Sequence, residues 1–386
     1  MQKDFHYYAT YCAATLAGYD HQESLAISYS DQMADWCTVT FLESIGAPTS
    51  AATTQMQLEL MKVRTDPIGL QDITRIWSSF HFLPGNLEAN PGKGGRRYRE
   101  KYRLICDTNG PLVAKTVELA KGRSPQAVGL AMHVVADTWA HRYFAGTPSL
   151  AINNTNRHFF EIIEGQPDRQ ISFGHVPGAA DDLENGNYNG TIYQASERSI
   201  MNLGHGRAGH FPDYSFAKYR YLPAWADYEE VLKDNPSDYY QAFCQVVYAL
   251  RYLHGDVATF ECDHYDYDIV APYEDEIREI INVRVLENCE GWKRLGEKLS
   301  GHAIEDFDMH AHEDEYKSAP ADQRDDTFLG RYILAALAQK SMVTHEIFAS
   351  GNRLAGRSIE YQKGGFAGIR DYLGLVNYRK GASDNE

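Results

Sequence analysis

Three ionisable side chains, His133, Asp137 and His141, are spaced four residues apart along one segment of the chain. At about 100° per residue they drift by only about 80° over two turns, so they share one face of a helix. The residues between them are mostly small or apolar, which predicts an interior helix: Val134, Val135, Ala136 and Ala140. Buried ionisable groups are costly unless they are paired or coordinate a metal, for which imidazole and carboxylate are natural ligands. The spacing therefore predicts a metal-binding helix.

Two simpler interpretations of this face stay open. The three residues could form a solvated stripe, or a ladder of His–Asp–His hydrogen bonds with no metal. We favour the metal because the other sides of the helix are so apolar.

Further histidines and aspartates stand in the first part of the chain, near the expected ends of helices. Asp4 and His6 directly precede an apolar helix, and Asp35 follows an apolar stripe. His81 lies between two phenylalanines and ahead of a Pro-Gly turn. Singly, each fits a satisfied core residue or a turn carboxylate. Together they indicate additional metal ligands.

A glycine-rich segment, Gly204–Asp213, holds His205, His210 and Asp213. Its glycines allow the backbone to bend closely around a bound ion or ligand. Arg207 in the same segment is a candidate for contacting negative charge that develops during a reaction.

Two other charged groups are less specific. His158 and Glu161 are three residues apart and could add a ligand pair or an acid–base pair. The basic run Arg96–Arg103 could clamp a phosphate near His81, but a solvated helix face, with Glu100 interleaved, is the favoured interpretation.

Helical periodicity dominates the rest of the chain. It predicts helices over residues 5–18, 22–45, 51–64, 110–122, 124–144, 225–255, 273–300, 325–350 and 355–373. Ser124-Pro125 is a good start signal for the central helix, because a capping residue precedes a proline in the first turn. The last residues, 382–386, are typical of a frayed tail.

Regular periodicity disappears between residues 165 and 212, where Gly, Asn, Pro and Asp dominate. A loop this long inside a compact domain is usually functional or disordered, and its histidines favour function. We expect an all-α fold in a single multi-helix domain. Residues 1–224 would form the metal-binding core with the long loop, and residues 225–386 a helical C-terminal part packed on the same core.

Composition limits the possible partners. The net charge of −16, from 53 acidic and 37 basic residues, argues against a protein that binds duplex nucleic acid. The six cysteines are scattered without a CxxC motif, so we expect thiols in a reducing compartment. With neither a secretory signal nor an apolar run of membrane-spanning length, we expect a cytoplasmic protein without stable membrane insertion. Oligomeric state is left open.

The pattern of an early Asp and His followed by an HxxxD helix and a further His resembles the zinc-dependent phospholipase C and P1 nuclease superfamily. The segment Leu130–His141 looks like the central ligand helix of that family. The resemblance implies an all-helical enzyme with three zinc ions, in which a metal-bridging water attacks a phosphodiester. A carboxylate bridges two of those metals, and by order along the chain this role would fall to Asp137 or Asp35.

The sequence departs from the superfamily at three points. The family uses a processed N-terminal Trp amine as a ligand, a place that Asp4 or His6 would have to take here. Its later HxxxE motif is not reproduced, since Ile162 stands four residues after His158, and the spacing from Asp35 to His81 is long. The resemblance covers residues 1–160. With its Asp4–Tyr8 start and its Phe80–Gly85 and Gly209–Asp213 segments, the whole chain looks more like an uncharacterised bacterial family near that superfamily.

The leading hypothesis is a hydrolase that acts on a phosphoester or phosphodiester through two or three divalent metals, zinc first and iron or manganese as alternatives. Its core ligands would be His6, Asp35, His81, His133, Asp137 and His141, with His205, His210 and Asp213 closing the site. One carboxylate, Asp137 or Asp35, would bridge the metals or act as general base.

Two alternatives come from other classes. One is a di-iron oxygenase or lyase in a helical scaffold, although the chain has neither an adjacent His-Asp pair nor Glu-x-x-His pairs in its central helix. The other is a non-enzymatic helical protein with a structural metal, although structural zinc sites are usually rich in cysteine.

Overall fold

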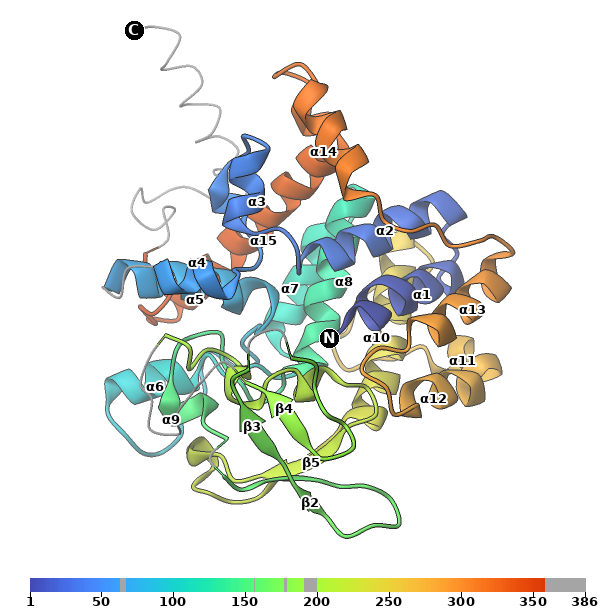
Figure 1. Ribbon diagram of the computed structural model, residues 1–386. Coiled ribbons are helices and arrows are strands. Elements are labelled where there is room, and N and C mark those ends of the chain that lie inside the picture. Colours follow the sequence, from blue (N-terminus) through green and yellow to red (C-terminus); the bar gives the residue numbers. More distant parts are fainter. Residues whose placement is uncertain (63–66, 156, 177–178, 191–199, 358–386) are drawn as a thin grey trace, which may run out of the picture.

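The computed structural model describes residues 1–62, 67–155, 157–176, 179–190 and 200–357. Helices make up most of it, and two small sheets lie together at one end of the molecule (Figure 1). Among the described helices, none is both long enough and apolar enough to cross a membrane. All six cysteines are free thiols, as expected, and four of them are buried.

The helices follow in chain order. The first part of the chain holds the π-helical segment η1 (Asp4–Ala9), α1 (Thr10–Leu16), α2 (His21–Met33), α3 (Val39–Ser44), η2 (Thr49–Ala51), α4 (Gln57–Lys62), α5 (Pro67–Phe80), α6 (Arg96–Tyr102), α7 (Pro111–Ala120), α8 (Pro125–Ala140) and α9 (Leu150–Asn153). The second part holds η3 (Gly206–Ala208), η4 (Phe211–Asp213), η5 (Ala224–Ala226), α10 (Asn235–His254), α11 (Tyr267–Val270), η6 (Ala271–Tyr273), α12 (Glu274–Asn282), α13 (Cys289–Ser300), α14 (Met309–Ser318), η7 (Arg324–Asp326) and α15 (Phe328–Ala349).

The prediction of an all-α fold is wrong. Strands β1 (Phe159–Glu161), β2 (Arg169–Gln170), β5 (Lys218–Tyr221) and β6 (Val231–Asp234) form an antiparallel sheet in the order β2-β1-β5-β6. Strands β3 (Ser172–Gly174) and β4 (Asn187–Asn189) form a separate parallel pair.

Buried aromatic side chains of β1 and β5 pack one face of the antiparallel sheet into a core. Phe159 pairs with Tyr221 across β1 and β5, and all three of Phe159, Tyr219 and Tyr221 are buried. They pack into a second core with rings from the long loop, such as Phe211 and Tyr188. Much of the loop predicted over 165–212 is therefore anchored by sheet pairing and by this core.

Several predicted helices are divided in the structure. The helix predicted over 22–45 ends at Met33. A second helix, α3, begins after Thr38, which caps it by accepting a hydrogen bond from the backbone N–H of Phe41. Residues 231–234, predicted helical, belong to β6, and the helix predicted over 273–300 is interrupted between α12 and α13. Parts of the helices predicted over 51–64 and 355–373, and the tail 382–386, lie outside the described residues.

The central element is α8, which contacts α2, α5, α7, α10 and α15. Fourteen of its sixteen residues are buried. The largest core unites side chains from η1, α1, α2 and α8 with others from α10, α13 and α15. Helices from both ends of the sequence therefore surround the predicted metal-binding helix.

Gly129 permits the close approach of α2 to α8. A Cβ atom at this position would lie 2.1 Å from the carbonyl oxygen of Ile27, a backbone atom that cannot rotate away. We therefore expect Gly129→Ala to push the two helices apart and to lower the free energy of unfolding by about 1–3 kcal/mol. Denaturant unfolding checks this against Gly174→Ala, where the new methyl group meets open space. Equal stability of both variants would contradict the proposed close contact.

Candidate metal centre

The helix α8 presents His133 and Asp137 in its last two turns, and His141 is the residue that caps its C-terminus. His141 stays in helical register because its N–H donates to the carbonyl of Asp137 at 2.9 Å. All three side chains are buried, with at most 5% of the side chain exposed. The predicted face is therefore present, and it points into the protein.

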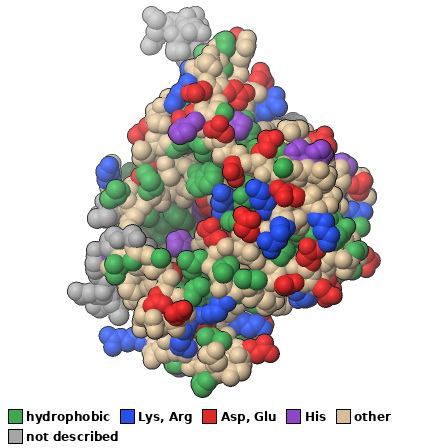
Figure 2. Space-filling view, turned by 45° about the vertical axis from the view of Figure 1, so that its right-hand side comes forward, with side chains coloured by type: hydrophobic (Ala, Val, Ile, Leu, Met, Phe, Trp, Pro, Cys, Tyr) green, Lys and Arg blue, Asp and Glu red, His purple; other side chains and the backbone are tan. Residues whose placement is uncertain are grey.

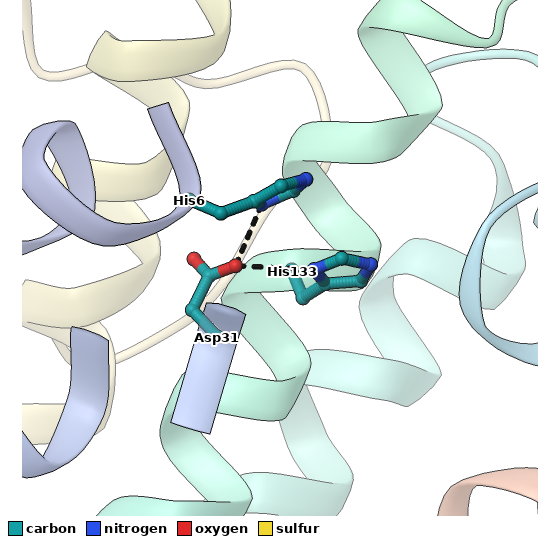
Figure 3. A group of neighbouring side chains, drawn as sticks. All are labelled: His6, Asp31 and His133. Carbon is teal, nitrogen blue, oxygen red and sulfur yellow. Dashed lines mark hydrogen bonds and ion pairs between the residues drawn. The ribbon is translucent and has the colours of Figure 1, made fainter. Parts of the chain in front are cut away.

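The first group of possible ligands joins α8 to η1 and α2 (Figure 3). Asp31 Oδ1 lies 2.7 Å from His6 Nδ1 and 3.2 Å from His133 Nδ1. The other oxygen of Asp31 accepts a hydrogen bond from Thr10 Oγ1 at 2.6 Å. The two imidazole rings stack with their centroids 4.0 Å apart. Asp31 was not among the predicted residues.

The second group consists of Asp35, His81 and His133. Asp35 leaves the end of α2, and its Oδ1 lies 3.9 Å from His81 Nδ1 and 4.0 Å from His133 Nε2. Asp137 Oδ2 stands between the same rings, at 3.1 Å from His81 Nδ1 and 3.2 Å from His133 Nε2. Two carboxylates and two imidazole nitrogens thus surround one point.

The third group consists of His141, His205 and Asp213. Asp213 Oδ1 lies 2.9 Å from His141 Nε2, and its Oδ2 lies 3.4 Å from His205 Nε2. His210 Nδ1 approaches the same carboxylate at 3.1 Å. The long loop, which curls through η3 and η4, therefore brings its predicted residues to the end of α8.

Asp137 connects these groups. Its Oδ1 lies 3.1 Å from His6 Nε2, and its Oδ2 lies 3.4 Å from His141 Nδ1. The amino group of Met1 lies 2.6 Å from Asp137 Oδ1 and 3.5 Å from Asp213 Oδ1. We expected Asp4 or His6 to take the place of an N-terminal amine, but the amino group of Met1 itself lies here and Asp4 does not. Asp137 is the common neighbour of every group.

Backbone carbonyls fix which nitrogen of three histidines carries the hydrogen. His81 Nε2 lies 3.1 Å from Thr53 O, His141 Nδ1 lies 2.6 Å from His81 O, and His205 Nδ1 lies 2.5 Å from Gly209 O. A carbonyl oxygen only accepts, so these nitrogens must donate. In a neutral ring the opposite nitrogen then carries a lone pair, and each of these nitrogens faces the carboxylate of Asp137 or Asp213.

A lone pair that faces a carboxylate is unfavourable unless a cation lies between them. The cation can be an added proton on the ring or a metal ion, and metal-bound histidines commonly donate their other N–H to a carbonyl in this way. The Nδ1 atom of His6 points to the same conclusion. It is buried and forms no hydrogen bond, although an oxygen of Asp31 lies only 2.7 Å away. These contacts have the geometry of ligands that converge on a cation.

The neighbouring charges lower the pKa values of two aspartates in the ligand groups and raise that of one histidine. Burial alone would raise the pKa values of Asp137 and Asp213, but neighbouring histidines and the Met1 amino group hold both well below the usual value. Burial would lower the pKa of His133, but the carboxylates, Asp137 foremost, raise it to about 10. Burial prevails at His205 and lowers its pKa to about 4. These directions favour the ionised form of both carboxylates.

The site reaches the surface at two of its residues. The side chain of Asp35 is 31% exposed and that of His210 is 68% exposed, whereas the remaining ligand candidates are largely buried. Figure 2 shows a hollow in one face of the molecule, with hydrophobic walls and with acidic and histidine side chains at its edge. A small molecule would approach the buried groups from the side of Asp35 and His210.

Two predicted site residues lie apart from the ligand groups. Asp4 is buried, but its oxygens accept hydrogen bonds from the backbone N–H groups of Phe5 and Asn288, and burial raises its pKa to about 6. Arg207 is buried in η3, where its Nε donates to Asn202 Oδ1 at 2.7 Å.

The other charged groups have structural surroundings. Glu161 is buried in β1 and pairs with Arg169 and Arg284, rather than sharing a helix face with His158. The basic run begins in α6, which has no buried residue, and Arg96 is 78% exposed beside Glu100. The run is therefore a solvated helix face, at least in α6.

Comparison with known proteins identifies a family and no activity. No curated protein and no solved structure matches the chain. One family model does match, a family of unknown function (DUF6765), and the match covers residues 1–347 of the 386. The chain, with the His and Asp groups around α8 inside the matched region, therefore belongs to this family of unknown function.

Proposed function

We propose that this protein is a metal-dependent hydrolase that cleaves phosphoester or phosphodiester bonds at the centre around Asp137. The observation that carries the proposal is the fixed orientation of His81, His141 and His205. One ring nitrogen of each lies against a backbone carbonyl, and the other faces a shared carboxylate. Neutral imidazole together with carboxylate is the ligand set of zinc and of iron or manganese.

The residues divide between holding the ions and serving the reaction. The three groups supply ligands for two or three ions, with Asp137 as the shared carboxylate. Divalent ions in such a site polarise a phosphoryl oxygen and activate water at neutral pH. Asp35, the most exposed carboxylate of the groups, is placed to accept a proton from water. The hydrogen bond with Asp213 raises the pKa of His210. This ring is therefore placed to return a proton at Nδ1 or Nε2.

The choice of a phosphoester rests on the resemblance to the zinc-dependent phospholipase C and P1 nuclease superfamily. Of the residues that suggested it, His6, the HxxxD pair of α8 and His141 are near neighbours in space, although 131 positions separate His6 from Asp137. Asp4 lies apart from them. The negative net charge of the chain does not oppose an anionic substrate, since bound ions reverse the local sign.

The test is metal analysis of the purified full-length chain, combined with hydrolysis of bis(p-nitrophenyl) phosphate and p-nitrophenyl phosphate. We expect stoichiometric zinc, cleavage of at least one ester, loss of activity with a chelator, and recovery when zinc is returned. A folded protein that holds no metal and ignores added zinc would contradict the proposal. So would stoichiometric iron with oxygen consumption, which indicates an oxygenase.

Metal binding should release protons. Because the pKa of His133 is raised from 6.5 to about 10 in the metal-free protein, the ring is protonated near neutral pH and the metal must displace that proton. We expect zinc added to metal-free protein in weak buffer at about pH 8 to acidify the solution, and zinc affinity to rise as the pH increases towards 10. Proton release is read with an indicator dye, and His133→Gln should release less. An affinity that is constant over this range would show that no ligand is protonated.

A further inference from the structure

The helices α7, α8 and α15 pack against one another (Figure 1). A cavity separate from the ligand groups lies between α7, the beginning of α8 and α15. Its volume is about 230 Å³. Its walls are mainly apolar, and Leu119, Leu130, Leu334 and Ala335 are among the residues that form them. The candidate metal centre uses other residues of α8, such as His133 and Asp137.

Two arginines are among the residues that line this cavity. Arg123 stands in the turn between α7 and α8, beside Ser124, and Arg331 stands in the first turn of α15. Both are exposed, and within the part of the chain that the structure describes neither guanidinium group has a hydrogen-bond or ion-pair partner.

Farther along α15, the polar side chains that line the cavity already have hydrogen-bond partners. Gln339 Nε2 donates to Thr116 Oγ1 at 2.9 Å and to Ser79 O at 3.1 Å, and both Gln339 and Thr116 line the cavity. Eight residues of helix separate Arg331 from Gln339, a length of about 12 Å. The lining is therefore mainly apolar, and Arg123 and Arg331 are its only charged residues.

We propose that this cavity binds an anionic amphiphile, an unbranched alkyl chain with a carboxylate or phosphate head. The chain would lie along α15 between Leu130 and Leu334, and the head would contact Arg123 and Arg331. Guanidinium groups bind carboxylate and phosphate in bidentate geometry, which suits either head. The volume exceeds the roughly 150 Å³ cavity that holds benzene but is below the range of about 300–1,000 Å³ typical of drug-sized ligands, so a single chain fits better than a branched lipid.

The experiment is calorimetric titration of the full-length protein with octanoate and with octyl phosphate, each with and without a chelator. We expect saturable binding of one molecule per chain, and the stronger of the two ligands identifies the head group. Octyltrimethylammonium, with the same chain and the opposite charge, should not bind. Arg123→Ala and Arg331→Ala should each weaken binding by at least about tenfold, the loss of one charge-assisted hydrogen bond.

Two further variants make the result decisive. Ala335→Phe fills the cavity from α15 and should abolish binding, with thermal unfolding used to confirm that the variant folds. Arg294→Ala removes an exposed arginine from α13 and should bind as the wild type does. Absence of saturable binding, equal binding of the cationic amphiphile, or binding that survives both arginine substitutions but disappears with the chelator would overturn the proposal. The last result would place the ligand at the metal centre instead.

Discussion

Asp137→Asn is expected to remove bound metal and to lower the rate of phosphoester cleavage by at least about 10³-fold, equivalent to about 4 kcal/mol of transition-state stabilisation. The side chain keeps its shape but loses its charge. Its two oxygens lie within 3.5 Å of nitrogens of His6, His81, His133 and His141, so the change weakens every ligand group at once. Metal content and kcat/KM of the purified variant are the measurements.

Asp4→Asn is the matched control. Like Asp137, Asp4 is a buried aspartate, but it accepts hydrogen bonds from backbone N–H groups only. An asparagine has one acceptor oxygen, so this variant should lose stability and keep its metal. If Asp137→Asn does not fold, His205→Gln tests the same centre from the loop. Full metal content and activity in both Asp137→Asn and His205→Gln would refute the assignment.

The part of the site on α8 could be predicted because a helix converts spacing into position. His133, Asp137 and His141 share a face by their four-residue spacing alone, and the apolar residues between them indicated burial. The other ligand candidates lie on separate elements, and sequence order does not state which of them meet. His6 and His81 join α8 only through tertiary packing.

Asp31 was missed although a signal was present. It lies four residues before Asp35, the same spacing that identified His133 and Asp137. We chose Asp35 because it follows the apolar stripe of α2, but α2 ends at Met33, so Asp35 leaves the helix and Asp31 faces α8 from inside it.

The sheets could not be predicted because their strands are two to four residues long. In β5, Tyr219 and Tyr221 alternate with Lys218 and Arg220. Four residues cover only two repeats of this alternation, which is too short a signal to be recognised beside the helical periodicity of the neighbouring segments. The pairing of β5 with β1 depends on backbone hydrogen bonds between segments about sixty positions apart. Such contacts leave no local periodicity.

Lys233→Met should cause the largest loss of stability among the substitutions away from the ligand groups. Lys233 in β6 is only 1% exposed, and its Nζ donates to the carbonyl oxygen of Trp139 at 2.6 Å and pairs with Asp238. The last carbonyls of a helix have no partner within it, so this ammonium group satisfies the end of α8 beside His141. The substitution would leave the carboxylate of Asp238, 15% exposed, without its ion-pair partner.

Breaking a buried ion pair by removing one partner costs about 3–5 kcal/mol, and denaturant unfolding of the chelator-treated protein should show a loss of this size. Lys218→Met is the control on the neighbouring strand β5, because Lys218 is 44% exposed and pairs with Asp234 at 2.9 Å. An exposed pair of this kind contributes at most about 1 kcal/mol. Adding Asp238→Asn to Lys233→Met should restore part of the lost stability, since the double variant no longer buries an unpaired charge. A loss for Lys233→Met no larger than that for Lys218→Met would mean that the end of α8, and with it His141, is held by packing rather than by this lysine.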